Sequence, residues 1–278
     1  MKFAVNALIW TTDFGPQNFS LLPMIREHGF DGFEVPLFLP AKMNAAATRQ
    51  ALQDSGLECT VSSILPEGMN VISEDGSVRK KTRQHLAECI KVTAELGSEL
   101  MAGPLYAPVG YLPGRRRTQD EWKWAVECFQ SLGEVLEENA VTLALEPLNR
   151  FETFFLNTAA DAMRLCDEIN HASIGILLDT FHTNIEEKDV AGVFRSVGKR
   201  LKHIHACEND RGIPGSGHVD FSGISKVLKQ GGYNGWVTIE SFGYTHKELA
   251  SAAAIWRDLA PSPESIAFDG VRFLKSVM

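Results

Sequence analysis

Three carboxylates and one imidazole lie at or near the ends of four short apolar runs. They are Glu146 in VTLALEPL, Asp179 in SIGILLDTFH, His205 in LKHIHAC and Glu240 in GWVTIESF. Carboxylates are rarely buried unless they are paired or bound to a metal, and three held together would repel one another without a cation. Because carboxylate oxygens and one imidazole suit Mn²⁺, Mg²⁺ or Co²⁺, this set predicts a cage for a divalent ion.

The four runs belong to a longer alternation of strand-like and helix-like segments. This alternation is typical of parallel βαβ units, and eight units predict an α/β fold of the (β/α)8 TIM-barrel class. In that fold the active site forms at the C-terminal ends of the strands, where the candidate ligands lie. An open doubly wound sheet is the alternative, but no glycine-rich phosphate turn follows the first run. The expected strands are residues 2–10, 30–38, 58–65, 99–106, 141–148, 173–181, 201–207 and 235–242.

The segments between the expected strands have apolar residues at three- and four-residue spacing, which predicts helices. Clear examples are 78–97, 120–140 and 159–170. Asn157 or Thr158 can cap the last of these helices, because both side chains accept hydrogen bonds from free N–H groups at a helix start.

The end of the chain predicts one further element. Residues 261–278 should form an extra C-terminal helix after the eighth unit, with Trp256 and Phe273 as packing residues. No linker or composition break divides the chain, so we expect a single domain over 1–278.

Charge and cysteine content exclude several classes of function. The net charge is −8, which argues against binding to nucleic acid. The one basic cluster, GRRRTQ at 114–119, is interpreted as a solvated loop. No apolar run approaches the ~20 residues that span a bilayer, so we expect no membrane partner. Five widely spaced cysteines without a CxxC pair predict free thiols and a cytoplasmic protein.

Four longer motifs around the candidate ligands resemble the ketose 3-epimerases, which act on D-tagatose, D-allulose (psicose) or L-ribulose. The motifs are ALEPLNRFETFFLN, LLDTFHTNIEEKD, HIHACENDRGIPGSGHVDF and TIESF. The resemblance extends over essentially the whole chain and implies a xylose-isomerase-like TIM barrel. It also implies a metal-dependent isomerase that inverts a ketose at C3 and forms a homodimer or homotetramer.

The resemblance implies roles for the matching residues. One divalent ion, Mn²⁺ ahead of Co²⁺ or Mg²⁺, would be held by Glu146, Asp179, His205 and Glu240. Contacts near O1 and O2 of the sugar would come from Glu152, His182 and Arg211. The far end of the sugar would be shaped by Asn6, Trp10, Phe14, Leu105 and Phe242. Asn6 replaces an aromatic residue of the family, which leaves the preferred sugar open.

The residue types also suggest a mechanism. Inverting a carbinol centre beside a ketone requires removal of the C3 proton on one face and its return on the other. A metal ion can act as a Lewis acid and stabilise the cis-enediolate between these steps. Glu146 and Glu240 can be the opposed acid–base pair, and such assistance is worth ~10²–10⁴-fold in rate. Arg211 and His182 can donate hydrogen bonds to the enediolate oxygens.

Two further polar residues lie in the expected strands. Strand alternation makes His203 point the same way as His205, one layer lower in the barrel, and we expect it to be a hydrogen-bonded core residue. Glu34 also ends a strand, where it either supports the site or pairs with a lysine.

Other reactions stay open on these residues. Related barrels isomerise aldoses and ketoses or hydroxypyruvate, dehydrate inososes, or belong to subunits that cleave C-glycosides. An apurinic endonuclease would require several zinc ions and a basic groove. A non-catalytic sugar-binding barrel would bind a ketose without turnover.

Overall fold

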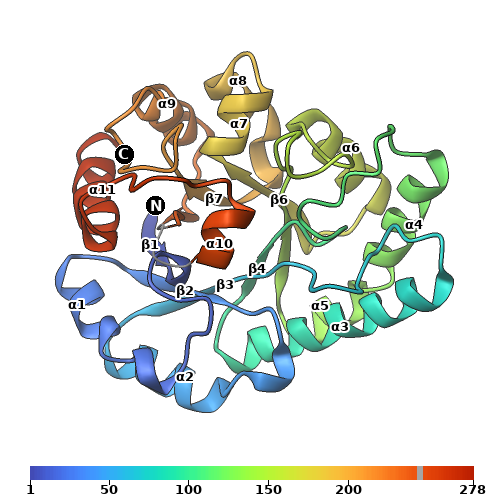
Figure 1. Cartoon of the computed structure of the whole chain (residues 1–278), viewed down its shortest axis with the longest axis horizontal. Helices are drawn as coiled ribbons and strands as arrows, with labels where there is room; N and C mark the ends of the chain where they lie inside the picture. Colours follow the sequence, from blue (N-terminus) through green and yellow to red (C-terminus); the bar gives the residue numbers. More distant parts are fainter. Residues whose placement is uncertain (243–246) are drawn as a thin grey trace.

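Eight parallel strands close into a barrel in the computed structural model, which describes residues 1–242 and 247–278 (Figure 1). Each strand pairs with the next along the chain, and the last pairs with the first. The predicted (β/α)8 barrel is therefore confirmed. The strands are β1 (Lys2–Asn6), β2 (Gly32–Pro36), β3 (Glu58–Ser62), β4 (Leu100–Gly103), β5 (Thr142–Leu145), β6 (Ile174–Asp179), β7 (Leu201–Ala206) and β8 (Trp236–Ile239).

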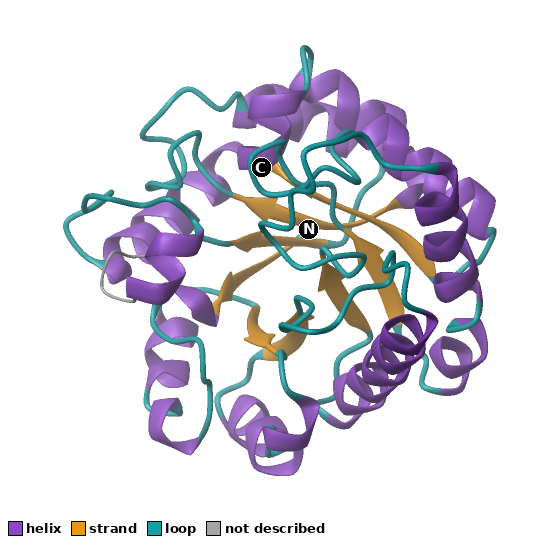
Figure 2. Cartoon of the chain, turned by 45° about the vertical axis from the view of Figure 1, so that its right-hand side comes forward, coloured by secondary structure: helices purple, strands orange, loops and turns teal. Residues whose placement is uncertain are grey.

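Helices surround the strands (Figure 2). The α-helices are α1 (Leu21–Glu27), α2 (Ala45–Asp54), α3 (Gly76–Glu95), α4 (Gln119–Gln130), α5 (Gly133–Glu138), α6 (Ala159–Ile169), α7 (Thr180–Glu186), α8 (Val190–Val197), α9 (Phe221–Gly231), α10 (Lys247–Ala252) and α11 (Pro263–Val277). Short 3₁₀ turns are η1 (Ala7–Ile9), η2 (Pro16–Asn18), η3 (Pro40–Lys42) and η4 (Gly198–Arg200). Thr158, one of the two expected caps, accepts the N–H of Asp161 at the start of α6.

The apolar residues form two layers of core. Strands such as β2 and β6 are buried along their whole length, as expected where helices cover the outside and side chains fill the inside. The interior of the barrel contains a small apolar cluster: Leu100, Ala102, Ala144, Leu177 and the partly buried Trp236. The larger core lies between the strands and the helices.

The strands are shorter than the apolar runs that predict them. The run at 2–10 ends as a strand at Asn6, because the Asn6 side chain accepts the N–H of Leu8 at 2.9 Å and starts η1. The residues that follow the strands therefore lie at the barrel opening, in loops or, after β1 and β6, in helical turns. Glu146 and Glu240 lie at such ends, directly after β5 and β8.

The predicted helix at 120–140 is two helices. α4 ends at Gln130 and α5 begins at Gly133. Glycine is a poor helix former, and a Cβ at Gly133 would lie 2.8 Å from the ring of His171. The break in the helix thus coincides with a close contact that only glycine permits.

The C-terminal helix is present as α11, capped by Ser262. Phe273 packs against Phe221 with the ring centroids 5.8 Å apart, as expected. The prediction that Trp256 packs is wrong, because its side chain is 71% exposed. Trp256 precedes α11 and lies outside the apolar face of that helix, so the periodic pattern did not apply to it.

The basic cluster at 114–119 forms ion pairs. Arg115 donates to both carboxylate oxygens of Glu121 at 3.0 and 2.8 Å. Arg117 donates to both oxygens of Asp161 at 2.9 and 2.7 Å. The cluster is a loop whose residues are mostly exposed, as predicted, and these two ion pairs fix it to α4 and α6.

Two further findings concern membrane-spanning helices and the cysteine side chains. Within the described residues, no helix has the length and apolar character required to cross a membrane. All five cysteines are free thiols, and four of them are buried.

Candidate metal centre and sugar cavity

The C-terminal ends of β5 to β8 bring the four candidate ligands together. Glu146 follows β5, Asp179 ends β6 and Glu240 follows β8. Asp179 is level with His205 in the register of β6 and β7. One ligand atom from each of the four residues lies within 4.8 Å of the other three, and all four residues are buried. We call these four residues the cage.

Three polar atoms of the cage are buried without a hydrogen-bond partner: Oε1 of Glu146, Oδ2 of Asp179 and Nδ1 of His205. The other oxygen of Asp179 accepts the N–H of Phe181 at 2.7 Å and caps α7. Unsatisfied buried polar atoms are rare, and a bound ion is one explanation for them. Because their lone pairs converge, the cluster fits a divalent metal site.

Burial dominates the electrostatics of the cage. It raises the pKa of Asp179 to about 7, although Arg211 opposes the shift. Burial also raises the pKa of Glu146 well above its usual value, and Glu240 and Asp179 add to the effect. Burial disfavours the charged form of Glu240 as well, but His205 and Arg211 outweigh it and lower the pKa. Without an ion, Glu146 therefore binds a proton more tightly than Glu240.

Arg211 reaches the cage from the loop after β7. Its guanidinium lies 3.6 Å from carboxylate oxygens of both Asp179 and Glu240. Its backbone φ is +64°, a left-handed conformation that is uncommon outside glycine. The hydroxyl of Ser241 donates to the Arg211 carbonyl, and the Arg211 N–H donates to the carbonyl of Glu208 at 2.9 Å. The strained backbone is thus held at both of its polar groups, with the side chain directed at the cage.

His182 lies in α7 and faces the same space. The backbone N–H and side-chain amide of Asn149 both donate to its Nδ1, at 3.2 and 2.9 Å. Burial and Arg211 keep the pKa of His182 well below its usual value, so the neutral ring carries its proton on Nε2. This Nε2 lies 3.7 Å from Oε1 of Glu146 and 3.4 Å from Nη2 of Arg211. Two donors lie side by side, an arrangement that suits a substrate oxygen.

Asn149 is a site residue that sequence reasoning did not single out. Its amide also donates to Glu152 at 2.9 Å, and Glu152 lies 3.8 Å from Arg211. Its own Oδ1 accepts the N–H of Phe151, which fixes the orientation of the amide. The available signal was the position of Asn149 between the two candidate glutamates in EPLNRFE.

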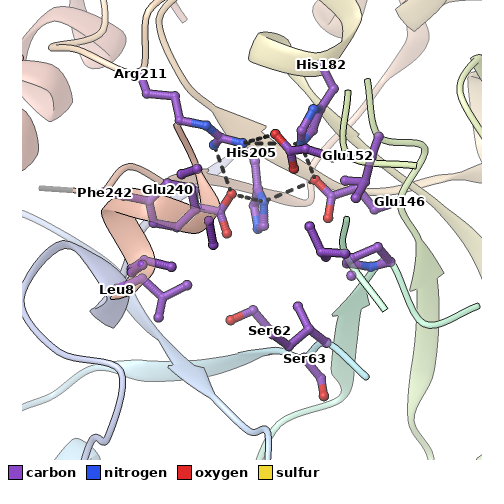
Figure 3. Close-up of a pocket in the computed structure, with 18 of the residues that line it drawn as sticks. Leu8, Ser62, Ser63, Glu146, Glu152, His182, His205, Arg211, Glu240 and Phe242 are labelled. Carbon is purple, nitrogen blue, oxygen red and sulfur yellow. Dashed lines mark hydrogen bonds and ion pairs between the residues drawn. The ribbon is translucent and has the colours of Figure 1, made fainter. Parts of the chain in front are cut away.

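A cavity opens beside the cage (Figure 3). Its charged and polar end is lined by Glu146, Glu152, His182, His205, Arg211 and Glu240. Most of the remaining lining is apolar: Leu8, Phe38, Ile64, Pro104, Val109, Leu148, Phe242, Leu249, Ala252 and Ala253, with Ser62, Ser63 and Gly103. α10 lies across the barrel opening in Figure 1 and supplies Leu249 and Ala252. A ligand would meet hydrogen-bonding groups at one end and mainly carbon at the other.

Four of the five residues expected at the far end of the sugar lie outside the lining of this cavity: Asn6, Trp10, Phe14 and Leu105. Trp10 donates to Glu264 at 3.0 Å. Phe14 packs on Phe33 with the ring centroids 4.7 Å apart, and Leu105 is fully buried in the larger core. Their contact with a sugar stays a prediction.

Asn6 is buried beneath the cage. Its Nδ2 lies 2.9 Å from Oε1 of Glu34 and 3.3 Å from Oε1 of Glu240. Because the Asn6 carbonyl oxygen accepts the N–H of Leu8, the amide orientation is fixed and Nδ2 must donate. Asn6 therefore contacts the cage directly, whatever its relation to a sugar.

The comparisons with known proteins agree with this fold. The sequence profile of the family described as "Xylose isomerase-like TIM barrel" matches residues 22–277. A probable ketose 3-epimerase of Synechocystis sp. is 36% identical over 275 residues, which are 99% of this chain and 96% of the relative. An L-ribulose 3-epimerase of Methylomonas sp. is 29% identical over 278 residues, covering 99% of this chain and 97% of the relative.

Solved structures give the same result. A D-allulose 3-epimerase from Methylomonas sp., crystallised in complex with D-allulose, is similar with a TM-score of 0.94 at 29% identity. The similarity covers 100% of this chain and 97% of that chain.

Proposed function

We propose that this protein, which belongs to the xylose isomerase-like TIM-barrel family and is an epimerase, inverts ketoses at C3 with a divalent metal ion. The names of its relatives suggest D-allulose, L-ribulose and D-tagatose as the ketoses to test first. The polar end of the cavity, with its carboxylates and paired donors, supports this assignment.

Glu146, Asp179, His205 and Glu240 would hold the ion, for which we propose Mn²⁺, with Co²⁺ or Mg²⁺ as substitutes. The free lone pairs of the cage support this role. When bound, the ion would act as a Lewis acid that polarises the ketone.

The acid–base steps would be performed by Glu146 and Glu240. These carboxylates come from different strands and lie on either side of His205 (Figure 3). One would remove the C3 proton, giving a cis-enediolate, and the other would return a proton to the opposite face. Without the ion, burial raises the pKa of Glu146, whereas at Glu240 burial is outweighed by His205 and the pKa is lowered. The two carboxylates can therefore hold opposite protonation states, as an acid–base pair requires.

The remaining polar groups would orient the substrate. His182 and Arg211 offer neighbouring donors for the enediolate oxygens, and Glu152 offers an acceptor for a hydroxyl. Phe242 lies at the boundary between the polar and apolar ends, because it lines the cavity and packs against Arg211.

The observation that carries this proposal is the placement of two carboxylates in one cage, and their replacement tests it. Glu146→Gln and Glu240→Gln should each lower ketose turnover by ~10²–10⁴-fold, as expected for loss of an acid–base group. In D₂O each variant should exchange the C3 proton of one epimer only, with opposite preference between the variants. Glu121→Gln is a matched control, because Glu121 is a buried carboxylate that pairs with Arg115 outside the cage.

Metal removal provides a second test. Dialysis against EDTA should abolish turnover, and Mn²⁺ or Co²⁺ should restore it. Turnover without metal, or full activity in either glutamine variant, would refute the proposal. Chromatography of the products separates C3 epimers from the aldoses that an aldose–ketose isomerase would form. The proposed homodimer or homotetramer is tested by the mass of the protein in solution.

A further inference from the structure

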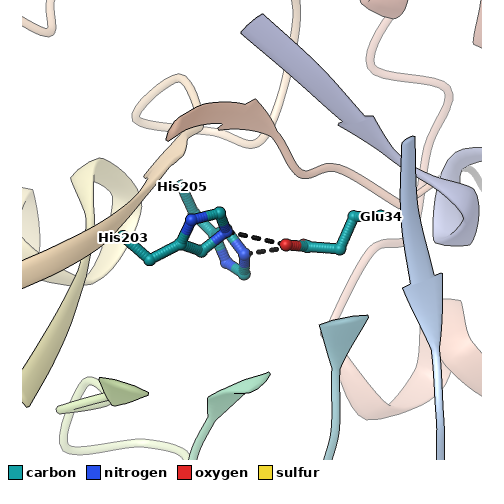
Figure 4. Close-up of side chains that lie close together, drawn as sticks. All are labelled: Glu34, His203 and His205. Carbon is teal, nitrogen blue, oxygen red and sulfur yellow. Dashed lines mark hydrogen bonds and ion pairs between the residues drawn. The ribbon is translucent and has the colours of Figure 1, made fainter. Parts of the chain in front are cut away.

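Glu34 of β2 lies inside the barrel with both of its carboxylate oxygens directed at two histidines of β7 (Figure 4). Oε1 lies 2.9 Å from Nε2 of His205, and Oε2 lies 2.7 Å from Nε2 of His203. All three side chains are almost completely inaccessible to solvent. These contacts cross the barrel, because β2 pairs with β1 and β3 and is not a neighbour of β7.

Two further donors complete the surroundings of this carboxylate. Nδ2 of Asn6 donates to Oε1 and the hydroxyl of Thr60 donates to Oε2, each at 2.9 Å. Glu34 thus receives four hydrogen bonds, two at each oxygen. A buried carboxylate in contact only with donors is an anion that accepts from all of them, and hydrogen bonds to a charged group are the stronger kind.

We propose that Glu34 is a positioning residue that holds the His205 ring with Nδ1 facing the metal ion. Because its oxygens can only accept, Nε2 of His205 must carry a proton, and the lone pair of the metal-bound ring is then on Nδ1. That atom lies 3.3 Å from Oε2 of Glu240 and 3.9 Å from Oε1 of Glu146, inside the cage. The inference rests on the proposed function in that it requires an ion at the cage.

His203 and Thr60 fix the carboxylate from its other side. Their bonds to Oε2 prevent rotation of the carboxylate, so Oε1 stays aligned with His205. The two imidazole rings are T-shaped, with centroids 5.1 Å apart, which places His203 one layer below. The expectation that His203 is a hydrogen-bonded core residue is consistent with these contacts. Of the two roles left open for Glu34, the contacts favour support of the site.

The same network extends to a second cage residue. Asn6 donates to Oε1 of Glu34 and lies 3.3 Å from Oε1 of Glu240. Glu34 therefore contacts His205 directly and is connected to Glu240 through the side-chain amide of Asn6. Such outer partners orient metal ligands, and their loss typically lowers metal affinity by ~10–100-fold.

Glu34, His203 and His205 also have the composition of a second metal site. Their ligand atoms, however, already pair at hydrogen-bond distances of 2.7 and 2.9 Å, and two more donors occupy the carboxylate. Protons therefore fill the positions that an ion would need. This geometry favours a role for Glu34 in holding His205 over a role as ligand of a second metal ion.

Metal affinity tests the role of Glu34. In Glu34→Gln the amide keeps one acceptor but turns an NH₂ group toward one imidazole, so the Kd for Mn²⁺ measured by calorimetry should rise ~10–100-fold. The visible absorption of bound Co²⁺ should change as well, because His205 is no longer held in one orientation. Glu121→Gln, the same change at a buried carboxylate outside the cage, should leave both readouts unchanged.

A milder pair of variants covers the case in which Glu34→Gln does not fold. Thr60→Val removes one donor to Glu34 at nearly constant volume and should weaken Mn²⁺ binding by about two- to fivefold. Thr93→Val is its control, because buried Thr93 donates to a helix carbonyl in α3. A purely structural role would lower the melting temperature of the metal-free protein in the Glu34 or Thr60 variants without changing the Kd.

The outcomes separate this inference from the proposed function. An unchanged Kd for Mn²⁺ in folded Glu34→Gln, or in Thr60→Val if the former is unfolded, overturns the inference and leaves the function standing. A wild-type protein that binds Mn²⁺ but does not epimerise ketoses overturns the function, while the Kd values still decide the role of Glu34. A wild-type protein without affinity for Mn²⁺ overturns both.

Discussion

The guanidinium of Arg211 lies 4.1 Å from the ring centroid of Phe181. It also lies 4.6 Å from that of Phe242. A planar cation packed on aromatic faces keeps its edge N–H groups available for carboxylates and substrate oxygens. The two rings therefore contribute to the orientation of Arg211, together with the contacts of its strained backbone.

Replacing the first ring should weaken substrate binding. Phe181→Leu removes the cation–π contact, worth ~0.5–2 kcal/mol, so we expect the KM for the ketose to rise about 2–30-fold. Steady-state kinetics at saturating Mn²⁺ measure the change. Phe151→Leu is the control, because the Phe151 ring is 70% exposed and is not one of the two rings that pack on the Arg211 guanidinium. An unchanged KM in Phe181→Leu would show that the ring does not orient Arg211.

Mutation of Asn6 can distinguish two roles for this residue, a contact with the sugar and the positioning of Glu240. The resemblance to the family places it at the far end of the sugar, whereas its hydrogen bonds connect it to Glu34 and Glu240. If it positions Glu240, Asn6→Ala should lower kcat by about tenfold, the effect of roughly one hydrogen bond to a charged group, with little change in KM. A raised KM at constant kcat would instead indicate a sugar contact. Asn139→Ala, which removes an amide bonded to a carbonyl of α5, should change neither constant.

The cage was accessible to sequence analysis because each ligand interrupts an apolar run. Glu146 and Glu240 are charged residues at the ends of strands, and the C-terminal ends of barrel strands meet at one face. Glu34 satisfies the same rule, but its partners did not follow from the sequence. Its bonds cross the barrel from β2 to β7, and the distance across depends on the closure and stagger of all eight strands.

The surroundings of Arg211 were not accessible for a similar reason. Its contacts with Phe181 and Phe242 join the loop after β7 to helix α7 and to the segment after β8, so no local spacing predicts them. Helix ends were also less certain than helix positions. The helix at 120–140 contains an apolar pattern across its break, and the close contact between Gly133 and His171 beside the break does not follow from that pattern.

Mn²⁺ binding should depend on pH in a defined direction. Burial raises the pKa of Asp179 from 3.8 to about 7, so between these values the metal-free fold holds a proton that the unfolded chain has released. The stability of the metal-free protein should therefore fall as the pH rises through this range. An ion must displace the same proton, so Mn²⁺ affinity should rise by up to about tenfold per pH unit through this range.

Calorimetric titrations with Mn²⁺ between pH 5.5 and 8 measure this dependence, and thermal unfolding of the EDTA-treated protein measures the accompanying loss of stability. Asp179→Asn removes the titrating group, so its weaker binding should depend less on pH. A Kd for Mn²⁺ that is constant across the range would contradict the displacement of a proton from Asp179.

Gly103, at the end of β4, should be the most sensitive glycine beside the cavity. Its φ is +140°, and a Cβ at this position would overlap the carbonyl oxygen of Ser63 in the neighbouring loop. Because that atom belongs to the backbone, the clash cannot be relieved by a side-chain rotation, and Gly103→Ala should lower the free energy of unfolding by more than ~1–3 kcal/mol. Gly68→Ala is the matched control: its φ is also positive, at +76°, but a Cβ there meets no atom within 4 Å. Denaturant unfolding should show a clearly larger loss for Gly103→Ala, and equal losses would mean that strand β4 shifts to accommodate the methyl group.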